Sequence, residues 1–298
     1  MRGRRRFGRL STGGRQSALA VANGRVPRRI MTVSDAITPE ALDRWSRLAL
    51  ELDWTSDWVE GAIFPCEMVY FLAACDAARI RTVVESGRQD GYSTRILGEY
   101  ARRTGVRIVS IDFEDDADRA ARCRAMLAPY PIDLRKGNAF LAVVAAVRDA
   151  AGPAALIVDG PKGFLAQSMA LSALACGDVG LLAFHNLPER TDFRGHVESL
   201  ADRPAFYEAE VDPLDVPAWR ELRAHEREHC ARKGARRDLD ASSLGILRFD
   251  SERRRRASRS VAGHFGFVQP ILISTLWRLG WDDLAYGLYV LAVKARQR

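Results

Sequence analysis

The sequence predicts an α/β protein built on a doubly wound, mostly parallel sheet. Between residues 81 and 184, five short apolar segments alternate with segments of helical periodicity. Short apolar strands separated by helices are typical of parallel strands that are buried on both faces. The polar residues follow the expected strands directly, where the loops of such a sheet meet at one edge. These observations favour helices on both faces, joined to the strands by right-handed crossovers.

The central elements are defined by where the apolar segments begin and end. We expect strands at Arg81–Glu85, Val106–Ile111, Ile132–Leu134, Ala155–Val158 and Val179–Phe184. We expect the intervening helices at Ser93–Arg103, Ala117–Leu127, Phe140–Ala150 and Leu165–Cys176.

Two helices are expected before the first strand. Thr38 is a typical N-cap residue and Pro39 suits the first helical position. The periodicity of that helix continues to Leu52, and a second helical pattern covers Cys66–Ala78. We therefore expect residues 31–79 to form a helical N-terminal cover.

The pattern loosens after the fifth strand. Phe206–Val211 and Ser243–Phe249 resemble strands that close the sheet as an antiparallel pair, with the charged helix Ala218–Lys233 between them. The main domain is thus expected to span residues 80–250. Residues 251–298 are expected to form a basic linker and a helical C-terminal extension.

The charge is distributed unevenly along the 298 residues. The net charge is +7, but residues 1–30 hold nine arginines and no acid, and residues 251–298 hold nine bases and three acids. The 27 bases and 35 acids that remain make the body acidic. Nucleic acid is therefore not an expected partner of the body.

The cysteines and the N-terminal segment indicate a cytoplasmic protein. The five cysteines are widely spaced and contain no C-x-x-C pair, which favours reduced thiols. Residues 1–30 lack the apolar stretch of a signal peptide, so we expect a disordered basic extension. No segment has the roughly 18 uninterrupted apolar residues of a membrane-spanning helix.

The loop after the first strand predicts a nucleoside ligand. Its glycines are spaced Gly87-x-x-x-Gly91, without the middle glycine of the dinucleotide fingerprint G-x-G-x-x-G. Glu85 favours a cationic ligand, and Asp112 stands at the end of the second strand, where a carboxylate accepts ribose hydroxyls. A nucleoside without a diphosphate agrees best with this pattern.

Residues 83–94, with the pattern E-x-G-x-x-x-G-x-S-T, resemble the first motif of class I S-adenosylmethionine-dependent methyltransferases. The resemblance covers roughly residues 80–250 and implies a Rossmann-like fold with a closing antiparallel strand. It implies that the cofactor S-adenosylmethionine is held by Glu85, Gly87 and Gly91 around its methionine part, by Asp112 at the ribose and by Asn138 near the adenine. Ser93 of the same motif is a further candidate cofactor-binding residue.

The next strand ends resemble a second, narrower pattern. Asp159-x-x-Lys162 and His185-Asn186 are similar to the site of cation-dependent, catechol-type O-methyltransferases. This resemblance implies a divalent cation, Mg²⁺ or Mn²⁺, held by Asp159, His185 and Asn186, with Lys162 as the base. His185 departs from the family, which has an aspartate there, so His185 is also a candidate general base without a metal. The candidate catalytic residues are Lys162, His185 and Asp159.

One motif points elsewhere. Residues 225–229 match the H-E-x-x-H pattern of zinc proteases, but charged residues stand between the histidines in a strongly charged stretch. We interpret this stretch as a solvated helix.

The sequence thus predicts an O-methyltransferase acting on a hydroxyl of a small molecule or sugar, with or without a cation. The alternatives are a non-catalytic cofactor-binding scaffold and a nucleotide-dependent oxidoreductase. The arginines of residues 253–256 and the aromatic residues after them are suited to docking on an anionic membrane or on another subunit, as in a homo-oligomer. The alternative is that this segment packs on the body of the protein.

Overall fold

A computed structural model of the chain describes residues 37–160, 163–185, 205–206, 215–234, 244–249 and 284. At its centre is a seven-stranded sheet with the order β3-β2-β1-β4-β5-β7-β6. The strands are β1 (Thr82–Ser86), β2 (Arg107–Asp112), β3 (Ile132–Lys136), β4 (Ala154–Val158), β5 (Val179–His185), β6 (Ala205–Phe206) and β7 (Leu244–Arg248). Strands β1 to β5 are parallel, whereas β7 pairs antiparallel with both β5 and β6. The predicted doubly wound sheet and its closing antiparallel strand are confirmed.

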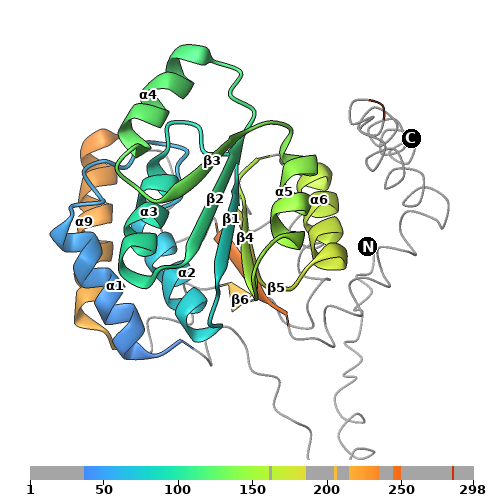
Figure 1. Ribbon diagram of the computed structural model, residues 1–298. Helices are drawn as coiled ribbons and strands as arrows, with labels where there is room; N and C mark the ends of the chain where they lie inside the picture. Colours follow the sequence, from blue (N-terminus) through green and yellow to red (C-terminus); the bar gives the residue numbers. More distant parts are fainter. Residues whose placement is uncertain are drawn as a thin grey trace, which may run out of the picture. The chain divides into compact units, whose positions relative to one another are not determined.

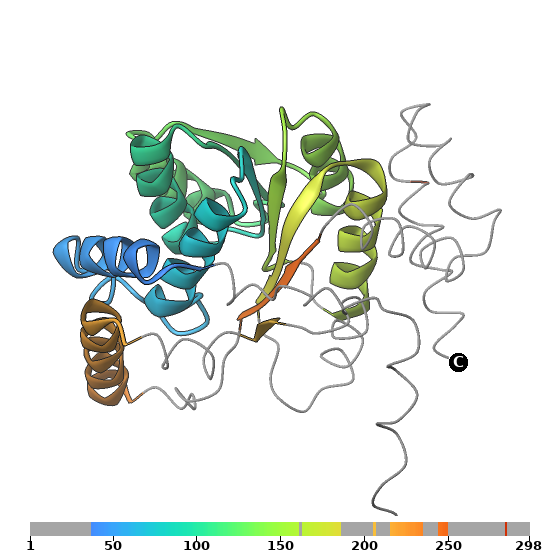
Figure 2. The same cartoon turned by 90° about the horizontal axis from the view of Figure 1, so that it is seen from below.

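Helices cover both faces of this sheet (Figure 1). The helices are α1 (Pro39–Glu51), α2 (Pro65–Ala77), α3 (Tyr92–Thr104), α4 (Ala117–Leu127), α5 (Ala139–Arg148), α6 (Gly163–Cys176) and α9 (Pro217–Lys233). Helices α5 and α6 pack on one face, and α2 and α3 pack on the other, where α1 and α9 form an outer layer. In Figure 2, β7 lies beside β5, and α9 lies beside α1.

Alternation along the strands divides the core into two. In β1, Val83 belongs to the core shared with α1, α2 and α3, while Val84 belongs to the core shared with α5 and α6. The same alternation directs Glu85 to the side of Val83. Glu85 thus lies on the face of the sheet that α2 and α3 cover.

Asp76, at the end of α2, joins the two N-terminal helices to the sheet layer. Its Oδ2 accepts a hydrogen bond from the indole of Trp45 in α1 at 2.6 Å, and its Oδ1 accepts one from the hydroxyl of Tyr100 in α3 at 3.0 Å. The rings of Trp45 and Tyr100 lie 5.0 Å apart. The helices expected as an N-terminal cover thus share one hydrophobic core with the sheet.

The segment between α1 and α2 lies against the start of α3. Tyr92 donates a hydrogen bond to the backbone oxygen of Trp54 at 2.8 Å, and Trp58 stacks on Phe64 with ring centres 4.7 Å apart. Trp54 and Trp58 are both buried. These tryptophans are therefore part of the core.

Helix α9 is not the solvated helix that its charge predicts. One face of it is buried against α1 and α2, and this face contains Leu222, Glu226 and His229. His225 is exposed whereas His229 is buried, so the two histidines of the H-E-x-x-H pattern do not face a common site. The high charge of this helix predicted a solvated helix, but several of its charged and polar residues are themselves buried.

Glu226 enters the core at the first turn of α2. Its Oε1 accepts a hydrogen bond from the backbone N–H of Cys66 at 2.5 Å. Burial, together with the nearby carboxylate of Glu67, raises the pKa of Glu226 to about 8. The hydrogen bond from Cys66 and the Arg223 guanidinium act to lower this pKa but do not outweigh burial. The glutamate is therefore protonated at neutral pH.

Several expectations lie outside the described residues. These are the basic extension of residues 1–30, residues 207–211 of the expected strand, and the C-terminal linker and extension except for Leu284. In the part of the chain that the structure describes, no helix combines the length and apolar character that crossing a membrane requires.

The buried Glu226 predicts a pH-dependent stability. In the unfolded chain this carboxyl loses its proton near pH 4.3, whereas the folded protein keeps it up to about pH 8. The folded state binds the extra proton between these values, so the free energy of unfolding falls as the pH rises, by up to about 1.4 kcal/mol per pH unit. Glu226→Gln keeps the acceptor for Cys66 and removes this dependence.

Urea unfolding at pH 5, 6.5 and 8.5 measures the effect. Wild type should lose stability relative to Glu226→Gln as the pH rises. The control is Glu228→Gln, an exposed neighbour on the same helix, which should follow wild type. Parallel pH profiles for wild type and Glu226→Gln would contradict the assignment.

Candidate functional site

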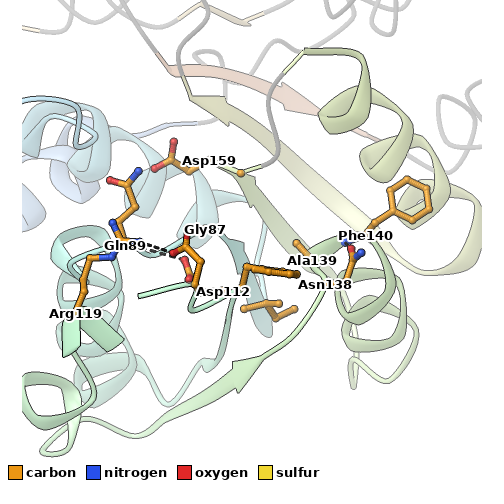
Figure 3. A pocket seen from close by; sticks show the side chains of 12 residues that line it. Gly87, Gln89, Asp112, Arg119, Asn138, Ala139, Phe140 and Asp159 are labelled. Atoms are coloured by element: carbon orange, nitrogen blue, oxygen red, sulfur yellow. Dashed lines mark hydrogen bonds and ion pairs between the residues drawn. The ribbon is translucent and has the colours of Figure 1, made fainter. Parts of the chain in front are cut away.

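A cavity of about 420 Å³ opens at the carboxyl ends of the parallel strands. Such a volume is within the range of small-molecule binding sites. Its lining residues are Gly87, Gln89, Ile111, Asp112, Phe113, Asp115, Arg119, Asn138, Ala139, Phe140, Asp159 and Gly160. Figure 3 shows Asp112 between Gln89 and Arg119 on one side and Asn138 on the other. Three of the lining side chains are carboxylates and one is a base, so the cavity favours positive charge.

The cavity lies where the winding of the sheet reverses direction. Strands β1 and β4 are neighbours, but their following loops turn toward opposite edges, which leaves a crevice between them. The backbone oxygen of Ser86 accepts hydrogen bonds from the backbone N–H groups of Asp159, at 2.9 Å, and Gly160, at 2.8 Å. The two loops are therefore joined below the cavity.

Gly87 makes this close approach possible. Its φ of +85° is in the left-handed region, and a Cβ at this position would come within 2.8 Å of the backbone nitrogen of Gly160. Any larger residue would be strained and would also push the two loops apart. The glycine predicted at this point thus serves backbone packing as well as lining the cavity.

Asp112 is held firmly by backbone amides. Its Oδ2 accepts hydrogen bonds from the N–H groups of Arg88, at 2.8 Å, and Gln89, at 3.1 Å, and its Oδ1 accepts one from Glu114 at 2.7 Å. Burial acts to raise the pKa of Asp112, but these three amides and the Arg88 guanidinium outweigh it, and the pKa is lowered. The group is an ionised acceptor, and three bonds leave it lone-pair capacity for a ligand in the cavity.

Glu85 lies beneath the loop and does not line the cavity. Its carboxylate is fully buried and accepts hydrogen bonds of 2.6 Å from the hydroxyls of Ser93, Thr94 and Ser110. Burial raises the pKa of Glu85, and Asp159 adds to the rise, while the three hydroxyls oppose it. In this structure Glu85 and Ser93 bind each other, and they connect β1, β2 and the start of α3.

Gly91 and Asn138 have clear local roles. Gly91 is the left-handed N-cap of α3, and a Cβ there would come within 2.8 Å of the Cys123 sulfur in α4. Asn138 is the N-cap of α5, because its Oδ1 accepts a hydrogen bond from the N–H of Phe140 at 3.0 Å. Of these two residues, only Asn138 also lines the cavity.

Asp159 and His185 form a hydrogen-bonded pair at the ends of β4 and β5. Val158 pairs with Phe184, so the next residue of each strand lies side by side. The Nδ1 of His185 is 2.6 Å from the Oδ1 of Asp159. The His185 side chain is 0% exposed, and its Nε2 is buried without a hydrogen-bond partner among the described residues. An ionised Asp159 accepts from Nδ1–H, which leaves the lone pair on Nε2.

The donor atoms at this point are arranged as a hydrogen bond and not as a pair of metal ligands. Two donors bound to one ion at about 2.0–2.2 Å lie roughly 3 Å or more apart, farther than the 2.6 Å between Nδ1 and Oδ1. Among the described residues, no group of three or more His, Cys, Asp or Glu side chains could hold a metal ion. Lys162 and Asn186 lie outside the described residues.

The sequence reading missed several residues of the cavity. Phe113, which follows Asp112 directly, is 68% exposed at the lining, and its place at a strand end could have identified it. Arg119 pairs with Asp115 at 2.6 Å. No sequence pattern identifies it as a cavity residue, because its position depends on the turn between β2 and α4. Gln89 has a φ of 44°, in the left-handed region, and the sequence does not predict this conformation for a glutamine.

Fold and cavity place the chain among the Rossmann-like α/β proteins. No family model matches the sequence, and no curated protein matches it.

The solved structures to which it is similar include methyltransferases. PaMTH1 from Podospora anserina, solved with SAH, is 16% identical over 72% of this chain and 89% of its own, with a TM-score of 0.39. The O-methyltransferase of Bacillus cereus, also with SAH, is 13% identical over 72% and 100%, with a TM-score of 0.39. TomG from Streptomyces achromogenes, with SAM, is 17% identical over 71% and 90%, with a TM-score of 0.39. Because these values are low, the fold assignment rests on the strand order and register.

Gly87→Ala should destabilise the protein for two reasons, left-handed strain and the collision with Gly160. The control Gly61→Ala has only the first, because Gly61 has a φ of +95° and open space around it. We expect the control to lose about 1 kcal/mol and Gly87→Ala to lose roughly 1–3 kcal/mol more. Urea unfolding measures both, and equal losses would show that the contact with Gly160 is unimportant.

Proposed function

We propose that the protein is an S-adenosylmethionine-dependent methyltransferase that methylates a hydroxyl of a small molecule or sugar, with His185 as the proton acceptor. The observation that carries the proposal is the continuity of two features. The cavity containing Asp112 extends to Asp159, and the Asp159 carboxylate binds His185. The cavity thus ends at a carboxylate that orients a buried imidazole behind it.

The residues of the cavity fit this cofactor. The ionised Asp112 accepts hydrogen bonds from ribose hydroxyls, and the exposed ring of Phe113 offers a stacking surface to a nucleobase. Asp159 favours the positive charge of the ammonium and sulfonium groups. The motif of residues 85–94, similar to that of the class I methyltransferases, supplies the loop that holds these groups in place.

When bound, S-adenosylmethionine would supply a methyl group carried on a positively charged sulfur. Transfer of this methyl group to an oxygen nucleophile leaves the sulfur as a neutral thioether. His185 accepts the proton of the acceptor hydroxyl at Nε2 as the oxygen–carbon bond forms. Asp159 keeps the imidazole in the tautomer that leaves Nε2 free, and it stabilises the imidazolium that results. Methyl transfer would thus leave the positive charge on a histidine that already has a carboxylate partner.

The backbone amides of the loop disfavour the rival oxidoreductase function. A dinucleotide needs free N–H groups for its pyrophosphate. Here the N–H of Gly87 donates to Ile111 at 2.8 Å, and those of Arg88 and Gln89 donate to Asp112. The amides that would bind a phosphate are thus already used within the protein.

Calorimetry with S-adenosylhomocysteine tests the cofactor. Wild type should bind it, and Asp112→Ala should bind roughly 10- to 100-fold more weakly, because hydrogen bonds to a charged acceptor are lost. The control Asp133→Ala, on β3 and outside the cavity, should bind like wild type. Wild type that binds NADH and not S-adenosylhomocysteine would favour the oxidoreductase and contradict the proposal.

His185→Gln should separate chemistry from binding. We expect kcat to fall by about 100-fold or more, since general-base catalysis contributes at that level, with the S-adenosylhomocysteine Kd within about twofold of wild type. The assay follows radiolabelled methyl transfer to a panel of catechols, phenols and monosaccharides.

Two further outcomes of this assay are informative. Activity that is unchanged by a chelator supports the metal-free base, whereas activity that disappears and returns with Mg²⁺ or Mn²⁺ assigns the proton transfer to a cation site. Wild type that binds S-adenosylhomocysteine but methylates nothing in the panel favours the non-catalytic scaffold.

A further inference from the structure

Arg88 lies in the loop after β1 that contains Gly87 and Gly91, which we call the glycine loop. Its side chain nevertheless turns away from the cavity into the protein. It is 1% exposed, which is unusual for arginine unless its charge is paired. Nη1 donates to the backbone oxygens of Ser110 at 2.8 Å and Arg135 at 3.3 Å, at the ends of β2 and β3. Nη2 pairs with the carboxylate of Glu114. One side chain thus connects the loop after β1 to the two neighbouring strands.

Glu114 is an equally unusual partner. Its side chain is 7% exposed, and its backbone has a φ of +52°, in the left-handed region. Its carboxylate also binds Arg124 of α4 at 2.7 Å. A residue other than glycine stays in this conformation only when its surroundings hold it there. The two arginines provide such a restraint.

The Arg88–Glu114 pair closes a ring around Asp112. The backbone N–H of Arg88 donates to Oδ2 of Asp112, and the backbone N–H of Glu114 donates to Oδ1. The side chains of the same two residues bind each other. Each oxygen of Asp112 is therefore held by one member of the ion pair, and Oδ2 also accepts a hydrogen bond from the N–H of Gln89. Two of the three bonds that direct the carboxylate thus come from residues of that pair.

We propose that Arg88 is a positioning residue, which through its ion pair with Glu114 aims the Asp112 carboxylate and so sets the preference for ligands that carry ribose hydroxyls. The inference rests on the proposed function, since it takes Asp112 as the ribose-binding residue. Arg88 does not contact the ligand. Its effect is specific to the part of the ligand that Asp112 binds.

This specificity distinguishes positioning from a general contribution to stability. If Arg88 merely stabilises the fold, its removal weakens every ligand of the cavity by a similar factor. If it aims Asp112, its removal weakens ligands with ribose hydroxyls and has little effect on ligands without them. The comparison of two ligands in one variant is therefore the informative measurement.

The experiment measures the Kd of S-adenosylhomocysteine and of its 2′,3′-dideoxyribose analogue by calorimetry, in wild type and in Arg88→Met. Wild type should prefer the hydroxylated ligand by about tenfold or more. In Arg88→Met this preference should fall to roughly threefold or less, because the hydroxylated ligand loses affinity and the analogue does not. Arg88→Lys should not restore the preference, since one ammonium lacks the forked geometry of guanidinium.

Two variants keep the test interpretable. Glu114→Gln breaks the ion pair from the other side and should reduce the preference in the same way, even where Arg88→Met folds poorly. Arg107→Met removes a partly exposed arginine that pairs with Asp133, and it should leave both Kd values unchanged.

A preference that stays at its wild-type value in folded Arg88→Met and Glu114→Gln overturns the inference while leaving the proposed function intact. Equal binding of both ligands by wild type also overturns it, because Asp112 then does not bind the ribose. Failure of wild type to bind S-adenosylhomocysteine at all contradicts the proposed function itself.

Discussion

The buried carboxylate of Glu85 is the interaction on which the site depends. It lies near the end of β1 and accepts three short hydrogen bonds, from two hydroxyls at the start of α3 and one on β2. A fully buried carboxylate is tolerated only when such donors satisfy it. These bonds fix where α3 begins relative to the sheet, and the glycine loop has to span the short distance between them. The direction of the loop amides toward Asp112 follows from that constraint.

The sequence was sufficient for the fold because its signals are local. Alternation of apolar strands and helices gave all five parallel strands, and Thr38 followed by Pro39 marked the start of α1. The strand ends were placed within a residue or two. That difference matters at His185, which is the last residue of β5 and lies one position beyond the expected end of the strand. Its alignment with Asp159 is set by the register of β4 and β5.

The parts of the site that the sequence did not reveal depend on contacts between distant segments. Whether Glu85 faces a ligand or a neighbouring strand depends on its pairing with Ser110, which no local pattern encodes. The inward turn of Arg88 depends on carbonyl groups at the ends of two other strands. Helix α9 misled for the same reason, because its charged sequence conceals the contact between Glu226 and the first turn of α2.

The hydrogen bonds from Asp159 and Gly160 to the oxygen of Ser86 connect the two halves of the site. The loop after β1, which lines the cavity, and the loop after β4, which carries the partner of His185, are therefore joined through their backbones. Under the proposed function, His185 has its carboxylate partner before any ligand arrives, because the hydrogen bond between His185 and Asp159 is present without one. The proton acceptor and the cofactor loop of the proposed function would therefore keep their relative positions while the methyl acceptor binds and leaves.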